Sequence, residues 1–196
     1  MGGCKERVLA RLHAARLHAR PLRAKARQRV APVVKRHFTA TAFLVRGDAT
    51  LLHWHRRLGQ WMPPGGHIEE DEDPVQAVLR EILEETGIVA EVIENAARHP
   101  FPYPEQLPAP YTILVEDIPG PGERHKHIDM IYFCRPLEGV DPLPVDDPTL
   151  LWVSERELQS ECLLDAAGCG VSAAVPEDVR QLALAAITAA RQTSIR

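Results

Sequence analysis

The spacing of apolar residues predicts an amphipathic helix over residues 74–86. At about 100° per residue, a largely apolar group of side chains falls on one side of that helix. Its members are Val75, Leu79, Ile82 and Thr86. Asp71 or Asp73 can serve as the N-cap, Pro74 suits the first turn, and Gly87 can end the helix in the left-handed conformation. We therefore expect a capped helix that packs on a sheet.

The pattern on either side of this helix is typical of strands, which are rich in β-branched and aromatic residues. The predicted strands are 37–45, 50–55, 89–94, 111–115 and 128–135. Residues 166–174 are predicted to be a linker of small residues, and Pro176 opens a final helix. The apolar stripe of that helix comprises Val179, Leu182, Ala183, Ala186 and Ile187. We expect this stripe to pack against the core.

Length and composition indicate one well-cored domain with an appendage. The chain has 196 residues, of which 45% are hydrophobic. No run approaches the ~20 apolar residues of a membrane span, and no segment resembles a secretory signal. The four cysteines form no C-x-x-C pair, so we interpret them as reduced thiols of a cytoplasmic protein.

Charge divides the chain near residue 36. The net charge is −4, yet residues 1–36 contain eleven Lys and Arg against one acidic residue, Glu6. We therefore predict a basic helical extension (1–36), a central domain (37–160), and a linker with a helix packed on that domain (161–196). Three interpretations of the extension stay open: a solvated or docked arm, a weak contact with RNA or another anionic surface, or a mitochondrial transit peptide.

Three acidic side chains fall within roughly 100° of one another on the predicted helix, which places Glu81, Glu84 and Glu85 on one stripe. Arg80 flanks the stripe and can pair with Glu84 or reach back to Glu72. Three carboxylates so close repel one another, so a helix built for stability alone would avoid them. Hard divalent cations prefer clustered carboxylate oxygens, which indicates a site for Mg²⁺ or Mn²⁺ with a phosphate-bearing ligand.

The same residues carry a family resemblance. Residues 66–88 follow the pattern G-x5-E-x7-R-E-U-x-E-E-x-G-U, with U a bulky aliphatic residue, and residues 61–69 follow W-x-x-P-G-G-x-x-E. Both resemble the signature of the Nudix hydrolases. The resemblance implies an α/β/α sandwich with a mixed β-sheet over roughly residues 37–160. It also implies a late strand and a capped helical turn over residues 150–158.

The resemblance implies cleavage of a nucleoside diphosphate linked to another moiety, giving a nucleoside monophosphate and a phosphorylated remainder. The implied metal ligands are Glu81, Glu84 and Glu85, and the implied catalytic residues are Glu84, Glu81 and Arg80. Glu84 is the implied candidate to orient or deprotonate the attacking water. Glu72 would hold Arg80 and Gly87 would end the helix, while the backbone at Gly65 and Gly66 supports the site.

Other residues are candidates for binding the substrate. By resemblance, the loop with Arg56 and Arg57 lies beside the phosphates. Phe101, Tyr103 or His99, in a proline-rich loop, is the leading candidate to stack on a nucleobase, and the alternative is that these residues cover the core. The resemblance also implies an additional carboxylate or a base from a later loop, for which Glu116, Asp117, Glu123 and Asp129 are the candidates. His125 and His127 can bind phosphate or carry a proton, whereas we interpret His53 and His55 as the polar outer face of a strand.

Two alternatives to catalysis of this kind stay open. One is a nucleotide-sensing domain without turnover, although such a domain should have lost signature carboxylates. The other is an enzyme like the isoprenoid-diphosphate isomerases, for which Cys134 would be the catalytic thiol. The expected partner is a nucleotide-type small molecule, and a homodimer is also considered.

Overall fold

The computed structural model describes residues 34–94, 96–118, 124–140, 147–166 and 170–193. The predicted basic helices and their contacts with RNA or an anionic surface fall almost wholly on residues 1–33, outside the described residues. Residues 34–196 form one compact unit. No helix of the described part is both long and apolar enough to cross a membrane.

A mixed sheet forms the centre of this unit. Its two longest strands, β1 (Lys35–Arg46) and β7 (His125–Pro136), run parallel, and every other strand in the sheet is antiparallel to its neighbour. Beside β1 lies β4 (Gly65–His67), and beside β7 lie β5 (Ala90–Val92) and β6 (Thr112–Ile118). The far end of β1 pairs with β2 (Ala49–His55), which is flanked by β3 (Gln60–Met62) and β8 (Leu150–Ser154).

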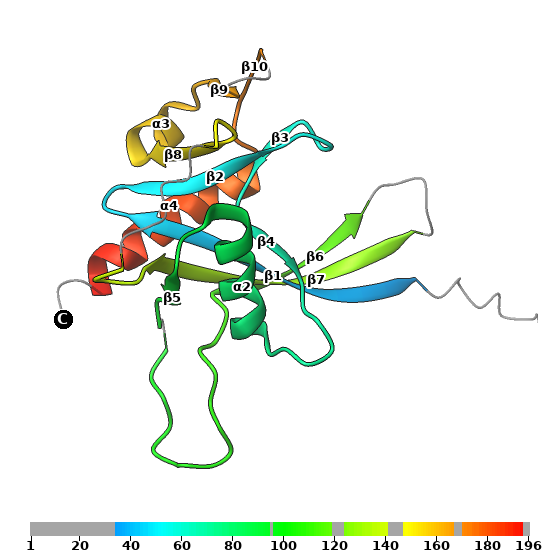
Figure 1. Ribbon diagram of the computed structural model, residues 1–196, viewed down its shortest axis with the longest axis vertical. Helices are drawn as coiled ribbons and strands as arrows, with labels where there is room; N and C mark the ends of the chain where they lie inside the picture. Colours follow the sequence, from blue (N-terminus) through cyan, green and yellow to red (C-terminus); the bar gives the residue numbers. More distant parts are fainter. Residues whose placement is uncertain (1–33, 95, 119–123, 141–146, 167–169, 194–196) are drawn as a thin grey trace, which may run out of the picture. The chain divides into compact units, whose positions relative to one another are not determined.

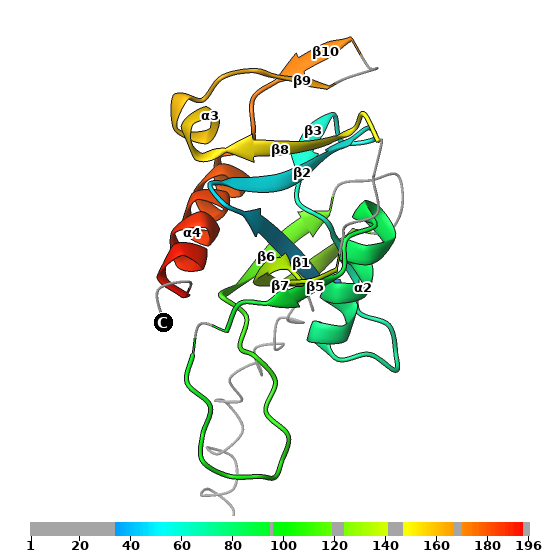
Figure 2. The ribbon, with the colours of Figure 1, turned by 60° about the vertical axis from the view of Figure 1, so that its left-hand side comes forward.

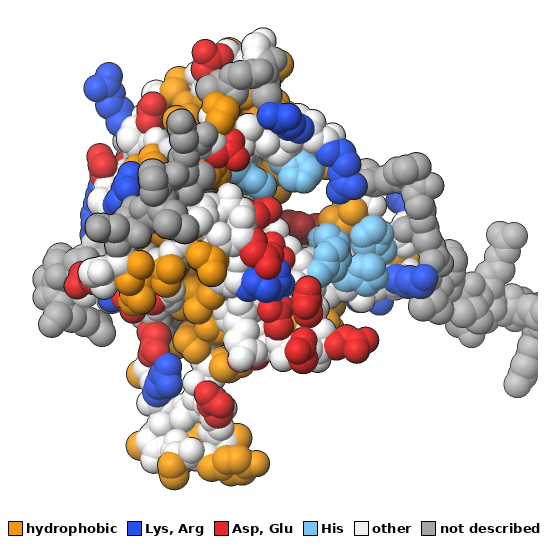
Figure 3. Space-filling model, in the orientation of Figure 1, with side chains coloured by type: hydrophobic (Ala, Val, Ile, Leu, Met, Phe, Trp, Pro, Cys, Tyr) orange, Lys and Arg blue, Asp and Glu red, His pale blue; other side chains and the backbone are white. Residues whose placement is uncertain are grey.

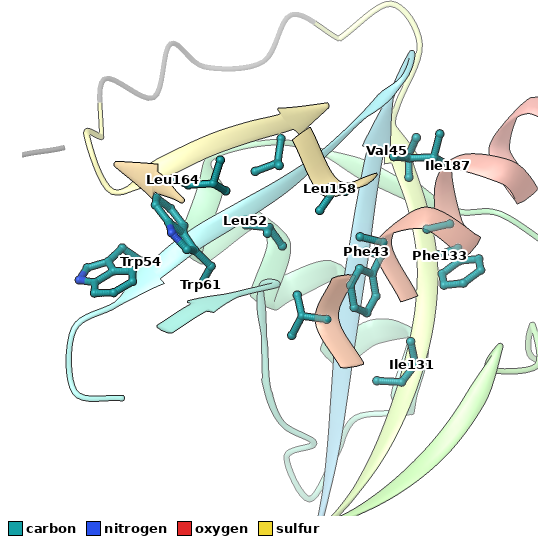
Figure 4. Packing of buried hydrophobic residues seen from close by; sticks show 14 of the residues in the cluster. Phe43, Val45, Leu52, Trp54, Trp61, Ile131, Phe133, Leu158, Leu164 and Ile187 are labelled. Carbon is teal, nitrogen blue, oxygen red and sulfur yellow. The ribbon is translucent and has the colours of Figure 1, made fainter. Parts of the chain in front are cut away.

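Helices cover the two faces of the sheet (Figure 1). The helix α2 (Pro74–Thr86) lies on one face and α4 (Glu177–Thr193) on the other, and the turned view in Figure 2 shows the same layers. Under α2, a core cluster includes Ala42, Leu44 and Ile82. Under α4, a second cluster joins residues of β1 and β7 to Ala183 and Ile187, as Figure 4 shows. The helix that we predicted from residue 176 onward is therefore part of the core.

The ends of α2 follow the capping rules. Asp73, and not Asp71, is the N-cap: its carboxylate accepts hydrogen bonds from the backbone N–H groups of Val75 (2.7 Å) and Gln76 (2.9 Å). Gly87 ends the helix with φ 68°, a left-handed conformation that favours glycine. The buried residues of the helix are Ala77, Val78, Ile82 and Thr86. Of the four residues predicted on the apolar side, Ile82 and Thr86 are buried, whereas Val75 and Leu79 are partly buried and pack against the core cluster.

The region from residue 154 onward holds one confirmed prediction and one error. Ser154 caps the short helix α3 (Glu155–Ser160) through a reciprocal bond with Glu157, as the sequence predicts. Residues 166–174, predicted as a small-residue linker, instead contain the strand β10 (Val171–Ala173), which pairs with β9 (Leu164–Ala166). Leu164 and Ala166 alternate into the core cluster under α4, and this burial favours the strand conformation.

Candidate active site

Along one face of the sheet, the side chains of β1 and β7 change from polar at one end to apolar at the other. On β1 this face carries His37, Thr39, Thr41 and Phe43, and on β7 it carries His127, Asp129, Ile131 and Phe133. Because the strands are parallel and in register, their polar ends lie side by side and so do their apolar ends. The apolar ends pack in the core cluster under α4. The polar ends remain available to a ligand.

This polar stretch of the sheet lines a pocket of about 390 Å³, a size typical of small-molecule sites. The remaining walls come from four elements. The hairpin of β2 and β3 contributes His53, His55, Arg57 and Leu58, and β6 contributes Leu114, Glu116 and Ile118. The first turns of α4 contribute Asp178, Val179 and Leu182, and the signature segment contributes Gly65, Gly66, His67 and Glu85. Several residues of the predicted site therefore line a pocket whose other lining residues include side chains of the sheet.

Glu85 is the acidic residue of α2 that lines this pocket. Its Oε2 accepts a hydrogen bond from the backbone N–H of Gly65 at 3.1 Å. Burial raises the pKa of Glu85 to about 7 against the lowering effect of that hydrogen bond, and the neighbouring carboxylates of Glu81 and Glu84 raise it further. Figure 3 shows acidic side chains crowded over α2. Such a crowded, partly buried carboxylate is stabilised by a nearby cation.

Arg80 clamps the other carboxylates of the site. Its Nε and Nη2 donate to the two oxygens of Glu72, at 2.7 and 2.9 Å. Its Nη1 donates to Glu81 (2.8 Å) and to Glu84 (3.0 Å), and Nη2 also donates to the carbonyl of His67 at 3.1 Å. The predicted pairings with Glu72 and Glu84 are both present. One guanidinium thus orders three carboxylates and ties α2 to β4.

The two glycines of β4 allow the backbone to approach its neighbours closely. A Cβ atom at Gly65 would lie 2.7 Å from the carbonyl oxygen of Ala40, on the adjacent strand β1. A Cβ atom at Gly66 would overlap the carboxylate of Glu81. Any side chain at Gly66 would displace Glu81, so this glycine keeps the carboxylate against the strand.

Three predicted substrate-binding residues do not line the pocket. Arg57 does, whereas Arg56 does not. Phe101 and Tyr103, with exposed fractions of 43% and 86%, lie in the loop between β5 and β6 that projects from the domain in Figure 1. Gln106 holds this loop by hydrogen bonds with the backbone of Phe101 and His99. We therefore assign no stacking role to Phe101 and Tyr103.

Two histidines of the pocket were misread in the sequence. His53 and His55 were interpreted as a polar outer face, yet both line the pocket, with their ring centroids 6.0 Å apart. Burial lowers the pKa of His53, so its ring is neutral at pH 7. The alternation of His53 and His55 with Trp54 correctly predicted that both histidines lie on the same face of β2. It did not indicate that this face lines the pocket.

The additional carboxylates separate into distinct positions. Asp129 is buried and accepts a hydrogen bond from Thr39 Oγ1 at 2.8 Å, and burial raises its pKa. Glu116 lines the pocket, and its pKa is raised by burial and by the nearby charges of Asp129 and Asp178. By contrast, Asp117 forms an ion pair with Lys126 at 3.0 Å. Glu123 lies outside the described residues. Asp178 was not a sequence candidate.

The comparisons with known proteins agree with this geometry. Residues 35–168 match the family model described as NUDIX domain. The chain belongs to the NUDIX family. Among solved structures, a NUDIX-family hydrolase from Clostridium perfringens superposes with a TM-score of 0.58 at 25% identity, covering 79% of this chain and 98% of that one. The predicted family, the mixed α/β fold and the predicted class of enzyme, a Nudix hydrolase, are thereby confirmed.

Several relatives within the NUDIX family resemble parts of the chain. It is 36% identical over 94 residues to a CTP pyrophosphohydrolase of Escherichia coli (strain K12), covering 47% of this chain and 69% of that relative. It is 32% identical over 131 residues to a MutT-like protein of Streptomyces ambofaciens, covering 63% and 71%. An RNA pyrophosphohydrolase of Erythrobacter litoralis (strain HTCC2594) is 32% identical over 88 residues, covering 44% of this chain and about half, 49%, of that relative.

The thiol considered for an isomerase-like reaction is poorly placed within this NUDIX domain. Cys134 is completely buried in the core cluster under α2, and burial raises the pKa of its thiol. A thiol reacts as the thiolate, which this environment disfavours. Cys134 therefore acts as a small apolar residue of the core.

Proposed function

We propose that this NUDIX protein hydrolyses a pyrophosphate bond in a nucleoside diphosphate linked to another moiety, with Mg²⁺ or Mn²⁺ as its cofactor. The products are a nucleoside monophosphate and a phosphorylated remainder. The observation that carries this proposal is the position of Glu85. Its carboxylate lines the pocket, is bonded to Gly65 N–H, and has a pKa raised to about 7 beside two further carboxylates of the same helix.

The residues of the site fit a hard divalent cation. Three carboxylates project from one stripe of α2, and the single guanidinium of Arg80 pairs with only Glu81 and Glu84 among them. Mg²⁺ is typically held by a few carboxylates together with water and substrate phosphates. We assign Glu81, Glu84 and Glu85 as the side chains that would hold it. When bound, the ion supplies charge neutralisation for the phosphates and lowers the pKa of a coordinated water.

The chain itself positions the reacting groups. Arg80 fixes the carboxylates of Glu81 and Glu84 through its hydrogen bonds, and Glu72 fixes Arg80. Gly66 leaves room for the carboxylate of Glu81 against β4. Of the residues in the clamp, Glu84 has the most exposed side chain, at 60%. We assign Glu84 to orient or deprotonate the attacking water.

The pocket accounts for binding of the substrate. Arg57 provides a positive charge in the part of the wall formed by the β2–β3 hairpin, suited to a phosphate of the substrate. The rings of His53 and His55 and the side chains of Leu58 and Leu182 give the pocket both polar and apolar surface, which suits a nucleoside. This assignment replaces the exposed aromatic residues of the loop after β5.

A substrate panel tests the proposal. We would assay CTP and other nucleoside triphosphates, ADP-ribose, dinucleoside polyphosphates and 5′-triphosphorylated RNA with Mg²⁺ or Mn²⁺, and identify the products by ³¹P NMR. We expect hydrolysis of at least one of these substrates, giving a nucleoside monophosphate or, for RNA, a 5′-monophosphate end. We expect no hydrolysis after the metal is removed by a chelator. Tight binding of a nucleotide without turnover in any arm would instead support a sensing domain and overturn the proposal.

A further inference from the structure

Three histidines from three different strands converge beside the pocket. His37 of β1, His67 of β4 and His127 of β7 each offer one ring nitrogen, and these three atoms lie within 4.8 Å of one another. His37 Nδ1 and His67 Nε2 are 3.3 Å apart. Figure 3 shows histidine side chains gathered next to the acidic side chains of α2. We call these three residues the histidine triad.

The register of the sheet explains the convergence. His37 and His127 are directly paired across the parallel strands β1 and β7. His67 is paired with Thr39, two residues further along β1 and therefore on the same face as His37. The three side chains must point to one side of the sheet, and no rearrangement of the backbone is needed to bring them together.

The chemistry of the triad suits the binding of a metal ion. His127 Nε2 is buried and has no hydrogen-bond partner among the described residues. A buried ring nitrogen without a hydrogen-bond partner lowers the stability of the folded state, and a bound metal ion would provide the missing partner. Burial lowers the pKa of His127 to about 4, and the other groups that lower it are the imidazoles of His67, His125 and His37. The ring is thus neutral at pH 7, with a lone pair free to bind a metal.

We propose that His37, His67 and His127 form a second metal site, which binds a transition-metal ion of the Zn²⁺ class and is separate from the carboxylates of α2. Three imidazoles suit Zn²⁺, Ni²⁺ or Cu²⁺, whereas Mg²⁺ prefers oxygen ligands. Two nitrogens bound to one tetrahedral Zn²⁺ at ~2.0–2.1 Å lie about 3.4 Å apart, close to the separation of His37 Nδ1 and His67 Nε2. The third nitrogen, from His127, lies within 4.8 Å of both.

The site leaves one coordination position for a ligand from the pocket. Three protein ligands plus an open fourth position is the arrangement of zinc sites that bind water or substrate. His67 and His127 both line the pocket, so an ion held by the triad would be accessible to a ligand bound there. The carbonyl of His67 also accepts a hydrogen bond from Arg80, which links the triad to the clamp of α2. A phosphate oxygen of the substrate is the class of ligand that this position would take.

Equilibrium dialysis of the full chain tests the proposal without any measurement of activity. The chelator-treated protein would be dialysed against Zn²⁺ in excess Mg²⁺, so that Mg²⁺ occupies the carboxylates, and bound zinc would be quantified by mass spectrometry. We expect one Zn²⁺ per chain. His37→Asn and His127→Asn should each weaken binding by about tenfold or more. Zn²⁺ should also raise the Tm of the wild-type protein but not that of the double variant.

Two matched controls test four of the six other histidines. His53→Asn/His55→Asn removes the other pair of histidines in the pocket, and His13→Asn/His18→Asn removes two that lie outside the described residues. Both double variants should keep the zinc. The proposal is overturned if the wild-type protein binds no Zn²⁺ in excess Mg²⁺, or if binding survives in His37→Asn/His127→Asn.

A spectroscopic measurement on the wild-type protein keeps the proposal testable if the triad variants do not fold. X-ray absorption of the zinc-loaded chain should show the multiple-scattering pattern of several imidazole ligands. A first coordination shell made of carboxylate oxygens alone would contradict the histidine triad, because the zinc would then occupy the carboxylates of α2.

Discussion

Two groups of residues at and beside the pocket, which we call the helix wall and the sheet wall, are brought together in different ways. On the helix wall, Glu81, Glu84 and Glu85 lie within five residues of one another on α2, and Glu85 lines the pocket. On the sheet wall, His37, His67 and His127 come from β1, β4 and β7 and meet only through strand register. The helix wall offers hard oxygen ligands and the sheet wall offers imidazole nitrogens. The comparison shows that two groups of candidate metal ligands lie at and beside one pocket, of which only the first follows from local spacing.

The largest expected effect concerns the helix wall. Glu84→Gln keeps the shape of the side chain but removes its charge, so we expect turnover to fall by about 10²-fold or more with the Tm nearly unchanged. Steady-state kinetics on the substrate found in the panel measures this. Glu94→Gln is the matched control, because Glu94 pairs with Arg98 on the surface and does not line the pocket. Near-normal turnover of Glu84→Gln would remove Glu84 from the catalytic assignment.

A smaller effect is expected from the residue that joins the two walls. Arg80→Lys keeps a positive charge but cannot donate simultaneously to Glu72, Glu81 and the carbonyl of His67. We expect kcat to fall by about 10- to 100-fold, as for other residues that orient metal ligands. The apparent affinity for Mg²⁺, from titration of activity, should weaken in parallel. An unchanged Mg²⁺ dependence would show that the clamp does not organise the carboxylates.

The charge state of Glu85 gives a prediction about stability. Its pKa is raised from the ordinary value of 4.5 to about 7, so the folded state binds the proton more tightly than the unfolded state does. Without metal, the stability that this proton contributes is complete below about pH 4.5 and is lost as the pH rises to about 7. Urea unfolding from pH 4.5 to 8 measures it. As the pH rises over this range, the unfolding free energy of Glu85→Gln should increase relative to that of the wild type. A difference between the two that does not depend on pH would contradict the prediction.

The smallest effect is expected away from both walls. Tyr103 has an exposed fraction of 86% and does not line the pocket, so Tyr103→Ala should change KM by less than about twofold. His55→Ala, in the wall of the pocket, should raise KM by more than Tyr103→Ala does. Initial-rate measurements on both variants decide this. The reverse order would restore the predicted stacking role of the loop after β5.

The sequence predicted the helix wall because all of its information is local. Helical period, Asp73 and Gly87 as caps, and the spacing of the glutamates specify the arrangement within one segment. The pairing of Arg80 with Glu72 followed from the same spacing. The family signature then supplied the architecture of the sheet, which local patterns alone would not have given.

The sheet wall was missed because its contacts depend on which strands are neighbours. His127 was considered only together with His125, for binding phosphate or carrying a proton, since nothing in the sequence pairs it with His37, ninety residues earlier. The alternation of His53 and His55 was visible, but an alternating strand does not reveal which face lies on a pocket. Phe101 and Tyr103 were predicted to stack on a nucleobase because they are aromatic residues of a proline-rich loop. Their exposure depends on where that loop leaves the sheet, which the sequence does not indicate.

The most direct test of the account is a crystal structure of the full chain with Mn²⁺ and a non-hydrolysable nucleoside diphosphate analogue. Anomalous scattering locates Mn²⁺ independently of the surrounding protein density. The account predicts an anomalous peak within coordination distance of carboxylate oxygens of Glu81, Glu84 or Glu85, with a phosphate oxygen of the analogue on the same ion. An analogue bound with its diphosphate away from these residues, and no peak beside α2, would contradict it.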